Sequence, residues 1–182
     1  YMIDFLTKLL NTPSPTGFTS QAIALVEKEL AAFAEVRTEW TQKGSLLAFL
    51  PGQDRSEAPA TRGLTAHVDT LGGMVRGIKP SGRLELTNIG GFAWGSIEGE
   101  NCLVHTREKG TVRGCLLPNK ASVHVYDNVR DDKRDSASME VRHDARISNP
   151  EEVRQLGIEV GDFVSFNPKI EVVDGFVKSR HL

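Results

Sequence analysis

The sequence is short of several features, and each shortage excludes a class of protein. Only two of its 182 residues are cysteine, which excludes a disulfide framework and predicts that Cys102 and Cys115 are reduced thiols in a cytoplasmic protein. Neither sign of charge dominates, with 22 lysines and arginines against 24 aspartates and glutamates. We therefore expect no nucleic-acid partner and no anionic membrane partner. Every apolar run falls short of the roughly 20 residues that span a bilayer, and no signal peptide opens the chain.

What the sequence does contain is typical of a globular protein. Hydrophobic residues make up 39% and charged residues 25%, and the length suits one ordinary domain or two small ones. The first residue is Tyr1, which is not a translational start. We therefore expect that the sequence lacks residues at one end or at both.

The first 70 residues have the pattern of a layered α/β domain. Apolar residues recur at helical spacing in two segments, and short apolar runs follow. The predicted elements are helices over 2–10 and 19–33 and strands over 36–40, 46–50 and 64–68, with a polar loop over 53–61. The run at 64–68 is nearly continuously apolar, which is typical of a strand covered on both faces. Helices followed by such strands favour an α/β layer.

After Gly73 the pattern changes to short strands separated by glycines and prolines, which predicts a β-rich, barrel-like domain. The predicted strands cover 74–78, 84–86, 103–106, 111–117, 123–126, 139–142 and 162–166. A single helix is expected over 150–156, with Ser148 or Asn149 as its cap, Pro150 in its first turn and Gly157 at its end. The predicted domains are thus 1–70, an inserted domain over 71–172, and a strand over 173–182 that returns to the first domain beside 64–68.

The stretch "GLTAHVDTLGG" (63–73) carries the strongest candidate site residues. His67 ends an apolar run, at the sheet edge where open α/β sheets bind ligands. Asp69 has the same strand parity, so a carboxylate can accept one ring N–H and leave the other nitrogen for a metal. The pair alone is a common coincidence, and a structural histidine remains the alternative interpretation.

A second set of metal-binding residue types is a weaker candidate. Cys102, His105, Cys115 and His124 have the side chains of a structural zinc site. However, Cys102 and His105 are three positions apart on a predicted strand and should point to opposite faces. We therefore do not expect zinc there.

The sequence resembles the tetrahedral and deblocking aminopeptidases, a family of co-catalytic zinc peptidases also named glutamyl aminopeptidases or cellulases. Five stretches carry the resemblance, in family order along nearly the whole chain: "NTPSPTG", "TAHVDTLGG", "KPSGRLELTNIGG", "EEVRQLGIEVGDFV" and "DGFVKSRHL". The segment from Val123 to Ser138 departs most from the family pattern.

The resemblance implies an α/β metallopeptidase domain interrupted by a β-rich insert that helps to build a homo-oligomer. It implies that His67 binds one of two divalent ions (zinc, or cobalt or manganese) and that Asp69 is the catalytic carboxylate that orients His67. A bridging aspartate is expected directly after Leu182, with the remaining ligands beyond it. The implied reaction is removal of N-terminal residues from peptides by metal-activated water. These 182 residues alone would then be inactive.

Two other functions remain as alternatives. The first is a non-catalytic assembly or binding module that ends at Leu182. The second is a glycoside hydrolase, suggested only by the name cellulase, which needs two carboxylates at a defined separation. The sequence offers no convincing pair of that kind.

Overall fold

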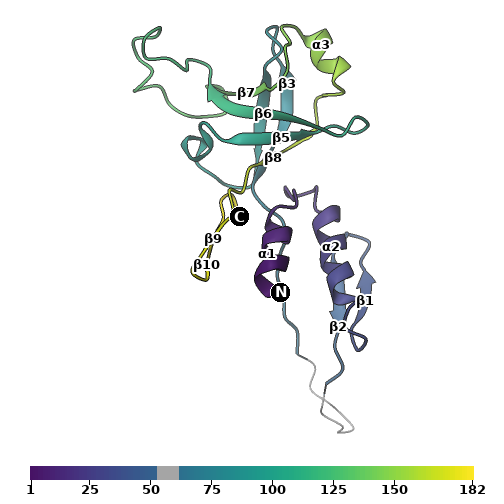
Figure 1. Cartoon of the computed structure of the whole chain (residues 1–182). Helices are drawn as coiled ribbons and strands as arrows, with labels where there is room; N and C mark the ends of the chain where they lie inside the picture. The colour runs from purple at the N-terminus through teal and green to yellow at the C-terminus, as the bar shows by residue number, and fades with distance from the viewer. Residues whose placement is uncertain (53–61) are drawn as a thin grey trace.

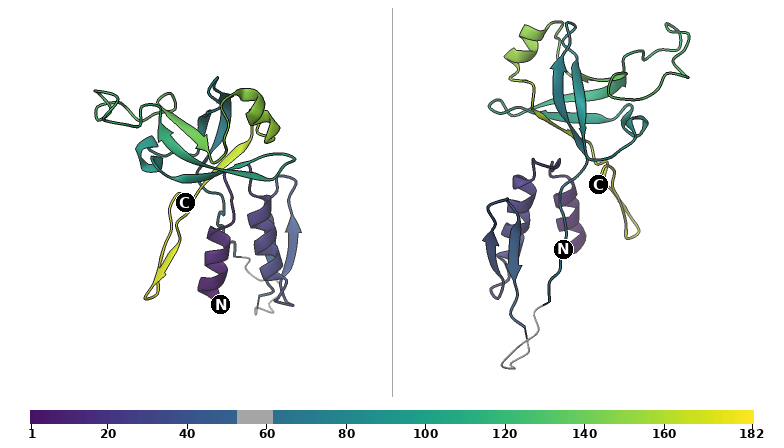
Figure 2. Two further views of the ribbon diagram at one scale, coloured as in Figure 1. Left: turned by 45° about the horizontal axis from the view of Figure 1, so that its top comes forward. Right: turned by 180° about the vertical axis from the view of Figure 1, so that it is seen from behind.

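The computed structural model describes residues 1–52 and 62–182, so the loop predicted over 53–61 lies outside the described residues. A β-barrel forms the largest part of the molecule (Figure 1). Two helices and a β-hairpin from the N-terminal residues lie below one end of the barrel, and the C-terminal residues hang from that same end (Figure 2).

The barrel has six strands and is antiparallel throughout. They are β3 (Gly72–Ile78), β4 (Leu84–Ile89), β5 (Asn101–His105), β6 (Thr111–Pro118), β7 (Met139–His143) and β8 (Phe163–Phe166). Their order, β3-β4-β7-β6-β5-β8, closes on itself, so no strand of the barrel has an unpaired edge. The β-rich barrel expected from the sequence is confirmed.

The barrel interior is the hydrophobic core of the described chain. Strand alternation produces it: in β6, Gly114, Leu116 and Pro118 face inward while the residues between them are less buried. Side chains from the strands, from residues 94–97 and from residues 150–158 fill the interior, among them Val75, Leu84, Leu86, Ile97, Val104, Leu116, Val141, Val153, Ile158 and Val164.

Helix α3 (Pro150–Gln155) lies against the barrel and has the ends that its sequence predicts. Asn149, not Ser148, is the cap, since its side chain accepts a hydrogen bond from the Glu152 backbone N–H at 2.9 Å. Gly157 follows the helix in the left-handed region, with φ of 85°. A short 3₁₀ helix, η1 (Trp94–Ile97), was not predicted.

The N-terminal elements are α1 (Met2–Leu10), α2 (Ser20–Leu30), β1 (Arg37–Trp40) and β2 (Leu46–Phe49). Strand β1 pairs with β2, as expected. Helix α2 ends earlier than the predicted residue 33, because tight turns that include a Val36 N–H to Phe33 carbonyl hydrogen bond lead the chain into β1. None of the helices in the described ranges has the length and hydropathy to cross a bilayer.

Two predicted strands are wrong. Residues 64–68 form no ladder, and Leu64 is 99% exposed instead of covered on both faces. A strand needs hydrogen-bonded neighbours, and within the described residues the nearest pairing is a single parallel bridge between Pro15 and Thr70. The segment 123–126 is a turn, closed by a Tyr126 N–H to Ser122 carbonyl bond, with Val125 pointing into solvent.

The C-terminal residues form a hairpin of β9 (Glu171–Val173) and β10 (Phe176–Lys178). The sequence predicted that this last strand would lie beside 64–68. In the described part of the chain β10 pairs with β9 instead, although the backbones of Leu71 and His181 do meet through a hydrogen bond.

Truncating the barrel core should destabilise the fold, whereas the same truncation outside it should not. Leu84 is fully buried, so Leu84→Ala should lower the free energy of unfolding by about 2–5 kcal/mol. Leu64→Ala is the matched control because that side chain is 99% exposed. Urea unfolding followed by circular dichroism measures both, and equal midpoints for the two variants would contradict the assignment of the core.

Candidate functional site

Three segments that are far apart in the sequence meet below the barrel. The Thr70 N–H donates to the Ser14 carbonyl at 2.8 Å, and the Thr16 N–H donates to the Thr70 carbonyl at 3.3 Å. The Leu71 N–H donates to the His181 carbonyl at 3.0 Å. Backbone hydrogen bonds therefore join the stretches "NTPSPTG", "TAHVDTLGG" and "DGFVKSRHL".

His67 and Asp69 form the contact that the sequence suggested. His67 Nδ1 lies 3.0 Å from Asp69 Oδ1 and 3.1 Å from the Asp69 carbonyl oxygen. The other carboxylate oxygen, Oδ2, accepts a hydrogen bond from the Thr16 hydroxyl at 2.6 Å. With Nδ1 as the donor, the imidazole presents Nε2 as its acceptor or metal-binding nitrogen.

These contacts favour the ionised form of Asp69. The Thr16 hydroxyl makes the largest contribution to lowering the pKa of this carboxyl. Burial opposes it, and the contacts with His67 lower the pKa further. The His67 side chain is 78% exposed, so its imidazole is accessible to a ligand.

Close backbone packing holds this arrangement against the barrel. A Cβ atom at Gly72 would lie 2.7 Å from the Val164 carbonyl oxygen and 2.8 Å from Pro15 Cβ. Only glycine therefore lets the chain pass from Asp69 into β3 at this point.

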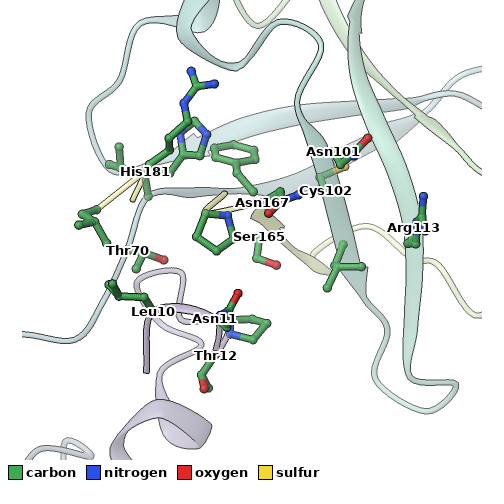
Figure 3. Close-up of a pocket in the computed structure, with 17 residues that line it drawn as sticks. Leu10, Asn11, Thr12, Thr70, Asn101, Cys102, Arg113, Ser165, Asn167 and His181 are labelled. Carbon is green, nitrogen blue, oxygen red and sulfur yellow. The ribbon is translucent and has the colours of Figure 1, made fainter. Parts of the chain in front are cut away.

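A pocket of about 340 Å³ opens where the segments meet (Figure 3). The turn after α1, the ends of β5 and β8, and the residues Thr70–Leu71 and Arg180–Leu182 line it. Its polar side chains include Asn11, Thr12, Asn101 and Asn167. His67 and Asp69 are not among its lining residues.

The described residues supply one candidate metal ligand and not a complete metal site. His67, oriented by Asp69, has the donor chemistry of a single ligand. Among the described residues, no three histidine, cysteine, aspartate or glutamate side chains are grouped so as to hold an ion. No catalytic step can be derived through a metal from these residues alone.

Comparison with known proteins assigns the family. Residues 44–182 match the model of the M42 glutamyl aminopeptidase family. The chain belongs to the M42 family. "Putative aminopeptidase YhfE" of Bacillus subtilis (strain 168) is 44% identical over 181 residues, which cover 99% of this chain and 51% of that protein. The chain thus spans about half the length of this curated relative.

Solved structures show the same fold. A TET aminopeptidase from the marine sediment archaeon Thaumarchaeota archaeon SCGC AB-539-E09 superposes with a TM-score of 0.77 at 22% identity, covering 94% of this chain and 45% of that one. The Pyrococcus horikoshii TET1 peptidase, which can assemble into a tetrahedron or a large octahedral shell, gives 0.70 at 21% identity, covering 96% and 49%.

The Cys/His set does not come together in the M42 chain. Cys102 lies in the barrel core, where burial raises the pKa of its thiol to about 12. His105 faces the other way, stacks on Phe18 at 4.7 Å between ring centroids and lies 2.8 Å from the Ser165 hydroxyl oxygen. The opposite orientations expected from strand alternation are confirmed.

Sequence reasoning missed Thr16 as a partner of Asp69. The two residues are 53 positions apart, and no local pattern links them. The available signal was that Thr16 lies within one of the stretches that resemble the family, directly before Gly17.

Removing the Thr16 hydroxyl should change the titration of Asp69. We expect Thr16→Val to raise the pKa of the Asp69 carboxyl towards its ordinary value, because the principal stabilising hydrogen bond is lost. The variant should therefore protonate Asp69 at a higher pH than the wild type, as measured by carbon-13 NMR of the carboxyl group. Thr12→Val is the control, since its hydroxyl donates to the Lys8 carbonyl. An unchanged Asp69 titration in Thr16→Val would contradict this geometry.

Proposed function

We propose that this chain supplies the first metal ligand and the assembly domain of a metal-dependent aminopeptidase. The observation that carries the proposal is the contact of His67 with an Asp69 carboxylate that Thr16 also binds. This arrangement orients an exposed imidazole in the manner of metal-binding histidines. Membership of the M42 glutamyl aminopeptidase family supports peptides as the substrate class.

In this proposal Asp69 acts through His67. Its carboxylate holds the Nδ1 proton and keeps Nε2 directed away from the Asp69 backbone, while Thr16 prevents the carboxylate from rotating. His67 would hold one of two divalent ions, which would supply the Lewis acidity that makes water a nucleophile for a peptide carbonyl. Zinc, cobalt and manganese all suit imidazole and carboxylate ligands.

The apolar surface of the N-terminal elements supports a larger catalytic domain. Helix α1 has no buried residue, and α2 buries only Ala22. Trp40 and Phe49 of the β1–β2 hairpin are each more than two-fifths exposed. We propose that further polypeptide covers these side chains and completes the layered α/β domain, since large exposed apolar side chains in a group mark a contact surface.

The alternatives have less support. A non-catalytic assembly module would not need the His67–Asp69–Thr16 arrangement, and the matching family model describes a peptidase rather than a glycoside hydrolase. We also propose a cytoplasmic location, with which the free thiols of Cys102 and Cys115 agree.

Two substitutions at the site should have different effects in the full-length gene product. His67→Ala should lose metal and hydrolysis of a leucine or glutamate anilide, because a direct ligand is gone. Asp69→Asn should keep much of the metal and lose about 10–100-fold in affinity or activity. Metal analysis of the purified proteins and a steady-state assay measure both. His124→Ala, in an exposed barrel loop, is the control.

The same assay tests the 182 residues by themselves. We expect no turnover by this chain with added zinc or cobalt, since it offers one ligand where a two-metal site needs several. Full activity of His67→Ala would refute the proposed role of His67. Metal-dependent turnover by the isolated 182 residues that survives repurification would refute the proposal that this chain holds only part of the metal site.

The barrel should also supply contacts between subunits. Gly72 pairs with Ser165, and the Leu71 N–H donates to the His181 carbonyl, so the segments before and after the barrel lie at the same end of it and a glycine linker can replace residues 72–172. We expect this deletion in the full-length gene product to reduce the molecular mass measured by light scattering, because symmetric association through the barrel is removed. An oligomer of the same subunit number would show that the contacts lie elsewhere.

A further inference from the structure

Glu100 is a buried carboxylate with positive partners on the C-terminal segment. It precedes β5 and is 2% exposed. Arg180 Nη1 pairs with Oε1, and Lys169 Nζ lies 2.9 Å from Oε2 as an ion pair without hydrogen-bond geometry. His181 Nε2 is 4.0 Å from Oε1. Arg180 also donates to the Ser96 carbonyl at 3.0 Å, which fixes its guanidinium against η1.

Two partners of Glu100 have an unusual backbone conformation. In the described ranges, three residues other than glycine have positive φ, and Lys169 at 44° and His181 at 66° are two of them. Such conformations are uncommon for residues with a Cβ and persist where the surroundings hold them. The His181 ring is itself fixed, packed edge-on against Phe166 at 5.3 Å between centroids.

The clamped segment contacts the stretch that carries the candidate ligand. The His181 carbonyl accepts the hydrogen bond of the Leu71 N–H at 3.0 Å, two residues after Asp69. The Asn167 N–H donates to the Asn101 carbonyl, and the Arg180 N–H donates to the Pro168 carbonyl, both at 2.9 Å. Glu100 is thereby connected through His181 and Leu71 to the backbone of the His67–Asp69 stretch.

Stability alone does not account for such a cluster. Burial of a carboxylate costs desolvation energy that its ion pairs do not reliably exceed, and well-packed apolar residues are often as stable. The Glu100 carboxylate pairs with two residues in the left-handed region, Lys169 and His181. This is better explained if the C-terminal segment must keep one defined backbone conformation.

We propose that Glu100 is a positioning residue that fixes residues 69–71 and 180–182 relative to each other, and with them the orientation of His67. The contribution of Glu100 to metal binding rests on the proposed function. Its role in fixing residues 69–71 and 180–182 does not depend on that function. Glu100 contacts neither substrate nor metal in this proposal and acts through His181 and Leu71.

The first test is hydrogen exchange of the Leu71 amide in the 182-residue chain. We expect Glu100→Gln to accelerate this exchange about tenfold or more. The Leu71 amide donates to the His181 carbonyl, and the variant releases the segment that contains His181. Glu140→Gln is a matched control: Glu140 is also buried, at 4% exposure, and pairs with Lys79 and Arg83 beside the β3–β4 turn. It should leave Leu71 exchange unchanged, and Glu100→Asp, which keeps the charge, should restore part of the protection.

The second test measures the dissociation constant of cobalt for the full-length gene product. Glu100→Gln should weaken it by about 10–100-fold, and Glu140→Gln should not. Equal Leu71 exchange in both glutamine variants would overturn the proposal, as would unchanged cobalt affinity of Glu100→Gln when the wild type binds the metal. If the wild type binds no metal, the proposed function fails, and Leu71 exchange alone decides the role of Glu100.

Discussion

Antiparallel closure of the barrel is the constraint on which the other features depend. Because β3 pairs with β8, the residue where the chain enters the barrel, Gly72, lies opposite Ser165, one residue before the last of β8. Entry and exit are thus held side by side, and the segments before and after the barrel leave it together. Without that closure, nothing would hold Leu71 next to His181. The His67–Asp69 stretch and the C-terminal segment would then have no fixed positions relative to each other.

The candidate site follows from this geometry through backbone contacts. The tight packing of Gly72 against Pro15 brings the turn after α1 beside residues 69–71, which places the Thr16 hydroxyl on the Asp69 carboxylate. The Asp69 carboxylate then orients His67. Each step is a short-range contact, but together they join residues from both ends of the described chain below one end of the barrel.

The two parts of the molecule differ in how far they are packed. The barrel has a continuous core with buried side chains from every one of its strands, whereas α1 buries none of its residues. The barrel can therefore be stabilised by its own apolar burial, while the N-terminal elements depend on contacts at their exposed apolar faces. That difference agrees with a chain that spans about half the length of its curated relative.

Much of the fold could be predicted from the sequence because it depends on local patterns. Alternation predicted the β-rich barrel, and the Asn-Pro start and Gly157 end predicted α3, since caps and strand periodicity involve neighbouring residues. The His67–Asp69 contact was also predictable, because the two residues are only two positions apart. Local pattern failed at 64–68, where an apolar run reads as a buried strand but has no ladder partner in the described chain.

The sequence by itself therefore determined most of the element types, the barrel class and the candidate pair of His67 and Asp69. Only the tertiary structure decided the order in which the strands close, the contact of Thr16 with Asp69 and the pairing of Glu100 with Lys169 and Arg180. The reason is physical: the side-chain contacts join residues 53 to 80 positions apart, and the closing strands β3 and β8 are also distant in sequence, so partners are selected by closure of the chain in space rather than by spacing along it.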